Sequence, residues 1–201
     1  NSTILDIDRS DPTLMLGKIA LPEKLDLQQK RNHYRLEVRP DLIKSLLVWR
    51  AKYTNQQALS PTPKSWGAPL FSIDSGENAK IILRDVSGGG LKLKIPRQTI
   101  KATDFDPEND KNFFIQIALW EPEEQKTDTY WLFAKSRNMQ EDYATRDLEI
   151  GLQFVGQGKS GKDASQNLVW KKVDPRDGVD EITTWVFRRH VENHRQKEAP
   201  D

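Results

Sequence analysis

The chain contains 201 residues, of which 36% are hydrophobic and 30% are charged, and its 31 Lys and Arg nearly balance its 30 Asp and Glu. This length can bury a core in one domain with an appendage or in two small domains. No apolar run is long enough to cross a bilayer, no secretory signal pattern is visible, and the absence of cysteine excludes disulfides and cysteine nucleophiles. The formal net charge of +1 argues against bulk nucleic-acid binding, although a local group of arginines can still hold a small anion. We therefore expect a cytoplasmic protein.

The first residues resemble the end of a domain rather than a domain of their own. Residues 1–27 hold two short apolar stretches separated by Asp, Ser and Pro, which is too little apolar sequence for a core. We expect residues 1–27 to be the tail of a truncated N-terminal domain with its linker. Residues 28–201 then form one domain, with a barrel over about 36–174 and a C-terminal helix over about 179–197.

Short alternating stretches predict β-strands through most of the second region. One strand begins just after Arg35, where Leu36 and Val38 alternate with polar residues. The other predicted strands cover 45–53, 79–86, 91–95, 112–120, 130–136 and 147–155, and a Pro-rich loop occupies 54–69. Many short strands without helical patterns between them favour an all-β barrel or sandwich.

The C-terminal segment predicts a helix instead, because acidic residues stand near its start and basic residues near its end. Its apolar residues fall on two arcs, one with Val179, Ile182, Trp185 and Val186, and another with Phe187 and Val191. The first arc is sufficient to cap one end of a barrel. The second arc needs another surface, which is the Pro-rich loop, a second subunit or an upstream domain.

Two patterns look chemical but favour a structural interpretation. Gly156, Gly158 and Gly161 have GxGxxG spacing, yet no helical pattern follows, so we expect a flexible surface loop. His190 and His194 are four residues apart on the predicted helix without a third metal ligand, so we expect a solvated helical face. No strained turn surrounds any serine, and we expect neither catalysis nor a metal.

Two polar motifs are candidate ligand contacts. Arg31 and Arg35 precede the first barrel strand, whereas Asp85, Ser87 and Gly90 end one strand and turn into the next. Side chains alternate along a strand, so Asp85 and Ser87 share a face and reach one ligand. Glycines in the turn allow positive backbone angles and close approach of a planar group. An arginine fork pairs with phosphate oxygens or with the O6 and N7 edge of guanine.

These motifs resemble those of the PilZ domain, a bacterial receptor module for cyclic di-GMP, which carries an RxxxR motif followed by a D/NxSxxG motif. The resemblance covers about residues 28–195, and the preceding residues look like the linker of flagellar brake (YcgR-like) members. It implies a mainly β fold, a six-stranded antiparallel β-barrel with a C-terminal α-helix. It also adds Lys30, Gly89 and Gly151 as further candidate contacts, with Lys30 a candidate for holding a second ligand molecule.

The resemblance implies a cyclic di-GMP effector that is not an enzyme and needs no cofactor. Ligand binding would rotate the barrel against an upstream domain and so control motility, exopolysaccharide synthesis or virulence. Expected partners are that upstream domain, a second copy of the chain or a downstream protein, without membrane insertion. One alternative is a PilZ-like adaptor that binds only proteins. The other is a barrel that binds single-stranded nucleic acid through stacking on tryptophans 49, 66, 131 and 170.

Overall fold

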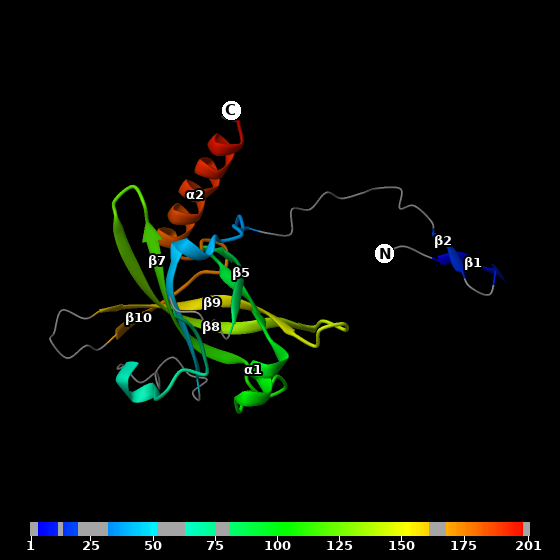
Figure 1. Ribbon diagram of the computed structural model, residues 1–201, viewed down its shortest axis with the longest axis horizontal. Helices are drawn as coiled ribbons and strands as arrows, with labels where there is room; N and C mark the ends of the chain where they lie inside the picture. The colour runs from blue at the N-terminus through cyan, green and yellow to red at the C-terminus, as the bar shows by residue number, and fades with distance from the viewer. Residues whose placement is uncertain are drawn as a thin grey trace. The chain divides into compact units, whose positions relative to one another are not determined.

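The computed structural model describes residues 4–11, 14–19, 32–51, 63–74, 81–160 and 168–198 (Figure 1). The chain divides into two compact units, residues 1–31 and residues 32–201. The first unit contains an antiparallel hairpin of β1 (Ile4–Asp11) and β2 (Leu14–Ile19).

Within the described residues, the second unit forms a curled antiparallel sheet of eight strands. They are β3 (Ile43–Arg50), β4 (Phe71–Asp74), β5 (Ile82–Ser87), β6 (Gly90–Ile95), β7 (Asn112–Glu121), β8 (Lys126–Glu141), β9 (Leu148–Ser160) and β10 (Leu168–Lys172). The order is β4-β3-β7-β8-β9-β6-β5, and β10 pairs with β9. Helix α2 (Asp180–Glu198) follows the sheet. The expected fold class, a mainly β antiparallel barrel with a C-terminal helix, is confirmed.

Short helical turns connect some of the strands. These are η1 (Pro40–Leu42), η3 (Pro63–Trp66) and α1 (Arg97–Ala102). The strand expected after Arg35 is reduced to a single bridge between Leu36 and Val86. Because Pro40 starts η1 and lacks an N–H for a ladder, regular pairing begins only with β3.

The sheet has two strands more than the six expected, because β4 and β10 were not predicted. The interpretation of the GxGxxG region as a surface loop was wrong at Gly156 and Gly158, which lie inside β9. They pair with residues of β10, which returns to extend the sheet. A Cβ at Gly158 would lie 3.2 Å from the Cβ of Trp131, so close packing explains this glycine. Gly161 lies outside the described residues.

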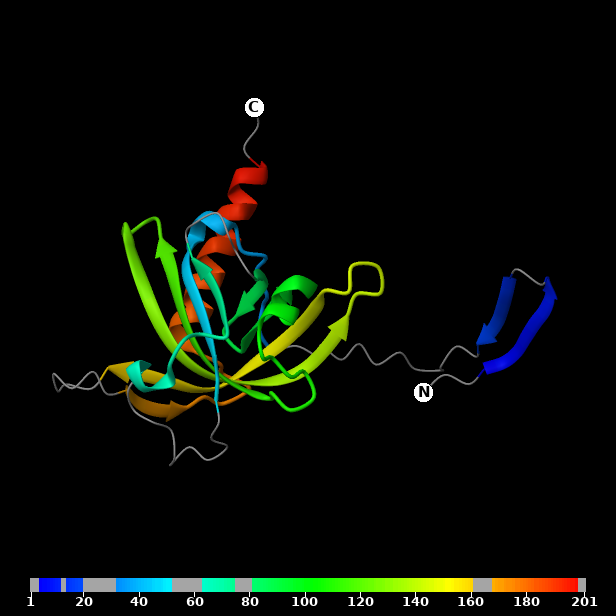
Figure 2. The same ribbon diagram turned by 60° about the horizontal axis from the view of Figure 1, so that its bottom comes forward.

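Most buried apolar side chains lie inside the curl of the sheet. Helix α2 adds its first apolar arc to this core, and Val179, Ile182, Trp185 and Val186 are all buried there. Burying one such side chain contributes roughly 1.5–3 kcal/mol, so the arc is a main source of helix docking. The helix lies between the β7–β8 hairpin and the β5–β6 end of the sheet (Figure 2). The predicted cap is therefore confirmed.

A second apolar cluster lies on the opposite, outer face of β3, β7 and β8. It contains Trp49, Ala51, Phe114 and Phe133, against which Trp66, Trp131 and Trp170 pack. The ring of Trp66 stacks on Phe114 with centroids 4.1 Å apart, and Trp49 Nε1 donates to the carbonyl of Gly67 at 2.9 Å. The described part of the Pro-rich loop thus packs on this cluster, whereas Phe187 on α2 remains 64% exposed.

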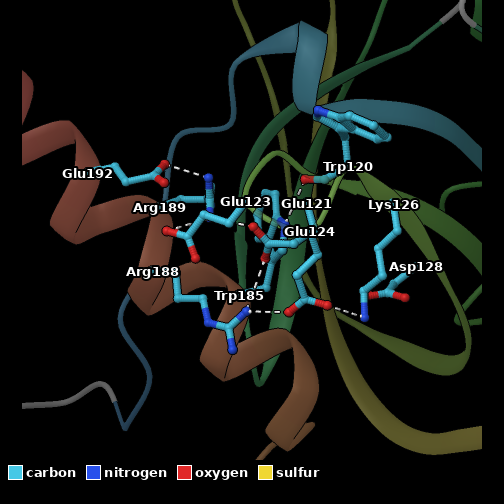
Figure 3. Close-up of polar contacts among 10 residues, drawn as sticks. All are labelled: Trp120, Glu121, Glu123, Glu124, Lys126, Asp128, Trp185, Arg188, Arg189 and Glu192. Carbon is cyan, nitrogen blue, oxygen red and sulfur yellow. Dashed lines mark hydrogen bonds and ion pairs between the residues drawn. The ribbon is translucent and has the colours of Figure 1, made fainter.

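A buried ion pair fixes helix α2 against the β7–β8 hairpin (Figure 3). The side chain of Arg189 is 2% exposed, and its Nη2 lies 2.5 Å from Oε1 of Glu121, which is 3% exposed. Its Nη1 lies 2.5 Å from Oε2 of Glu192 on the same helix. Two charges removed from water are tolerated only as partners, so the pair fixes the position of the helix along the hairpin.

Neighbouring contacts continue this attachment towards solvent. Trp185 Nε1 donates to the carbonyl of Trp120 at 3.0 Å, and Arg188 Nη1 lies 3.1 Å from Oε1 of Glu124 (Figure 3). The Arg188 side chain is only half-buried, and exposed pairs of this kind contribute little.

Replacing the buried arginine tests the importance of this pair. Arg189→Met should lower the free energy of unfolding by about 3–5 kcal/mol, because buried Glu121 then keeps only the half-exposed Arg188, whose Nη1 lies 3.5 Å from its Oε2. Urea denaturation measures the loss. Arg188→Met is the matched control on the preceding residue, and it should cost less than about 1 kcal/mol, because Arg188 is half-exposed and Glu121 keeps its buried partner Arg189.

Adding Glu121→Gln to Arg189→Met should restore most of the lost stability, because both charges are then absent. Equal losses for the two single arginine variants would contradict the role of the buried pair.

Candidate functional site

The segment that carries Arg35 lies along the edge strand β5. Leu36 N–H donates to the carbonyl of Val86 at 2.9 Å, and Val86 N–H donates back to Leu36 at 3.0 Å. This bridge places Arg35 beside Asp85, with Nη1 and Oδ2 3.7 Å apart. The Arg35 side chain is 45% exposed and that of Asp85 is 18% exposed. The structure therefore brings one residue from each motif together at the surface.

The other residues of the two motifs differ in what the structure says of them. Arg31 and Lys30 lie outside the described residues. Ser87 is buried, and its Oγ donates to the carbonyl of Gly90 at 3.1 Å. Asp85 and Ser87 both flank Val86, whose side chain points into the core, so they share the outer face of β5 as predicted from alternation.

The glycine turn between β5 and β6 does not use positive backbone angles, so that part of the interpretation was wrong. Among the described glycines, positive φ occurs at Gly67 and Gly178. The turn needs glycine because there is no room for a side chain. A Cβ at Gly88 would lie 1.9 Å from Thr183 Oγ1 on α2, and one at Gly90 would lie 2.2 Å from a carbonyl oxygen of β9.

The carbonyl groups of this turn bind three different elements. Gly88 accepts a hydrogen bond from Val179 N–H at 2.8 Å, just before helix α2. Gly89 accepts one from Phe154 N–H of β9 at 2.9 Å, and Gly90 accepts the Ser87 hydroxyl. The turn therefore joins the start of the helix, strand β9 and Ser87 of strand β5.

Two residues that sequence analysis did not select connect the arginine segment to the helix. The ring of His33 fills the space over Gly89, and its Nε2 lies 3.1 Å from the carbonyl oxygen of Pro175. The ring of Tyr34 lies 4.1 Å from that of His190 on α2. The two residues before Arg35 thus contact the segment that leads into α2 and α2 itself. No pattern in the sequence indicated these contacts.

A row of residues runs across the outer face of the sheet from Asp85. Asp85 on β5 lies opposite Lys92 on β6, Lys92 opposite Gly151 on β9, and Gly151 opposite Asn138 on β8. A Cβ at Gly151 would lie 1.9 Å from Asn138 Oδ1. The amide of Asn138 therefore covers Gly151, and a ligand reaches that candidate residue only if the amide moves aside. Lys92 forms an ion pair with Glu149.

A hollow of about 450 Å³ lies between the β7–β8 hairpin and α2. Its charged residues pair with one another, since Lys126 Nζ lies 2.6 Å from Glu124 and 3.5 Å from Asp128. At its edge, the hydrogen bond from the Lys159 ammonium lowers the pKa of Glu181. Burial raises the pKa of Tyr130 to about 12, so its phenol stays protonated at neutral pH. This groove is distinct from the motif residues.

Within the described part of the chain, no group of His, Asp or Glu is arranged to hold a metal ion. None of its helices combines the length and apolar character needed to cross a membrane.

The fold resembles that of a solved structure, the Bacillus subtilis inhibitor of motility MotI/DgrA. The two share 14% sequence identity with a TM-score of 0.51, and the match covers 95% of this chain and 66% of that one. At this identity the likeness concerns the fold alone, and it agrees with the expected PilZ-type fold. No family model matches the sequence, and no curated protein matches it.

The close contact at the glycine turn can be tested by mutation. Gly88→Ala should reduce the free energy of unfolding by about 1–3 kcal/mol, because the new methyl group meets Thr183 Oγ1. Adding Thr183→Ala should recover part of the loss, since the nearest atom is removed. Thermal unfolding with Thr183→Ala alone as the control measures both effects. A Gly88→Ala variant as stable as the wild type would contradict the packing argument.

Proposed function

We propose that this chain is a bacterial cytoplasmic effector that binds cyclic di-GMP, has no enzymatic activity and regulates motility. The observation that supports it most is the placement of Arg35 beside Asp85, both at the edge of the glycine turn. The likeness of the fold to that of a protein described as an inhibitor of motility supports motility as the regulated process. Exopolysaccharide synthesis and virulence are alternative outputs of the same mechanism.

The chemistry of the ligand suits this pair of side chains. Cyclic di-GMP carries two phosphate charges and two guanines, and an arginine fork can pair with either group. Asp85 can accept from the N–H groups of guanine, which adenine does not present in the same way. The Arg35–Asp85 contact is partly exposed, so exchanging it for ligand contacts costs little. In this proposal Arg31 adds a second fork, and Lys30 adds a further positive charge.

Ligand binding would act on helix α2. His33 and Tyr34 directly precede Arg35 and contact Pro175 and His190, so ordering the arginine segment changes the surroundings of the helix. The exposed Phe187 on α2 is then part of the surface through which the chain contacts its partner. That surface would meet an upstream domain, a second copy of the chain or a downstream protein.

The two rival functions differ in their support. An adaptor that binds only proteins is favoured by the exposed Phe187, and it predicts no response to any nucleotide. A single-stranded nucleic-acid barrel needs open aromatic faces. The rings of Trp49, Trp66 and Trp131 instead pack on one another, which weakens that alternative.

Calorimetry with cyclic di-GMP, GTP and an oligonucleotide distinguishes these functions. Wild type should bind cyclic di-GMP, while Arg31→Ala and Arg35→Ala should each weaken binding at least about tenfold, or roughly 1.4 kcal/mol, with little change in melting temperature. Arg39→Ala is the matched control, because Arg39 is exposed and pairs with Asp41 instead. Unchanged affinity in both motif variants would overturn the assignment.

Nucleotide preference tests the role of Asp85. Asp85→Ala should reduce the preference for cyclic di-GMP over cyclic di-AMP, since the carboxylate is the proposed reader of guanine, and such a contact contributes about 1–3 kcal/mol. Competition titrations with both dinucleotides measure this ratio. If the ratio stays the same, Asp85 does not read the base.

A further inference from the structure

A β-bulge on β8 places one arginine on the outer face, across strand β9 from Gly90. Ser136 lies opposite Leu152 and Asn138 lies opposite Gly151, so Arg137 is an extra residue between two regular pairs. Bulges redirect a side chain and are common beside functional sites. Here the exposed Arg137 turns towards β9, where its Nε donates to Oε1 of Gln153.

The register of the sheet connects this arginine to the D/NxSxxG motif. Ser87 lies opposite Gly90, and Gly90 lies opposite Gln153, the hydrogen-bond partner of Arg137. Adjacent strands are about 4.8 Å apart, so three steps from β5 to β8 span roughly 14 Å. Arg35 and Arg137 thus lie at opposite sides of a strip of the sheet, and the middle of this strip includes Gly90.

Arg137 differs from the neighbouring cations, because they form ion pairs with carboxylates and it does not within the described residues. On the same outer face, Lys92 and Arg84 both approach Glu149, and Lys94 lies 3.0 Å from Asp147. Within the described residues Arg137 forms no ion pair, and its partner Gln153 is a neutral amide. Gln153 can orient the guanidinium while leaving its outer N–H groups for an anion. Lys135, directly opposite Gln153, adds another positive charge.

We propose that Arg137, oriented by Gln153, forms the second end of the ligand site and binds the half of the dinucleotide that Arg35 does not reach. This inference rests on the proposed function. Cyclic di-GMP repeats the same phosphate and guanine groups in its two halves. A complementary surface therefore presents one arginine guanidinium to each half. Arg137 is a binding residue in this proposal, and Gln153 is a positioning residue.

Titration calorimetry with cyclic di-GMP tests the proposal on the full chain. Arg137→Ala should weaken binding at least tenfold without changing the melting temperature, because the side chain is exposed. Arg137→Lys should lie between wild type and Arg137→Ala, since lysine keeps the charge but lacks the fork. Combining Arg35→Ala with Arg137→Ala should multiply the two fold-losses, because the residues contact different halves of the ligand.

Arg97→Ala is the matched control for net charge. Arg97 is exposed just beyond the end of β6 that lies away from the glycine turn, so its loss should leave affinity unchanged. Equal weakening by Arg97→Ala and Arg137→Ala would mean general electrostatic attraction and would overturn the second contact. Wild-type affinity in Arg137→Ala would overturn the inference while leaving the proposed function in place. A wild-type chain that does not bind cyclic di-GMP would overturn both.

Discussion

The turn at residues 88–90 is the constraint on which the arrangement of the candidate site depends. Its glycines are pressed against helix α2, against His33 and against β9, and none of these contacts leaves space for a Cβ. Its three carbonyl oxygens bind the residue before the helix, the central strand and the motif serine. Because interiors are close-packed, moving one of these neighbours requires the others to adjust. Asp85, Ser87 and Gly90 are therefore built into the junction between sheet and helix.

Two kinds of interaction therefore hold helix α2, one at its start and the other in its middle. Its start depends on packing and a backbone hydrogen bond at the glycine turn, next to the proposed ligand contacts. Its middle depends on the buried pair of Arg189 and Glu121, far along the helix from that turn. A buried pair resists separation strongly, whereas exposed contacts such as Tyr34 with His190 exchange at little cost. His190 directly follows Arg189, so the exposed contact with Tyr34 and the buried pair lie at the same place along the helix.

Local patterns explain why much of the architecture was predictable. Alternation of apolar and polar residues located most of the strands, and the period of an α-helix identified the arc around Ile182 that caps the core. The spacing of Asp85 and Ser87 indicated a shared face. The short strands β4 and β10 were missed because neither has a pattern that stands out from its neighbours, and each depends on pairing with a distant strand.

The sequence by itself therefore determined the fold class, the core-facing side of each main element and the residue types that suit an anionic ligand. Only the tertiary structure decided which of them meet. The approach of Arg35 to Asp85, the contact of Gly88 with Thr183 and the bulge at Arg137 all follow from strand register and helix placement. Register is a property of paired strands far apart in the chain, so no local pattern encodes it.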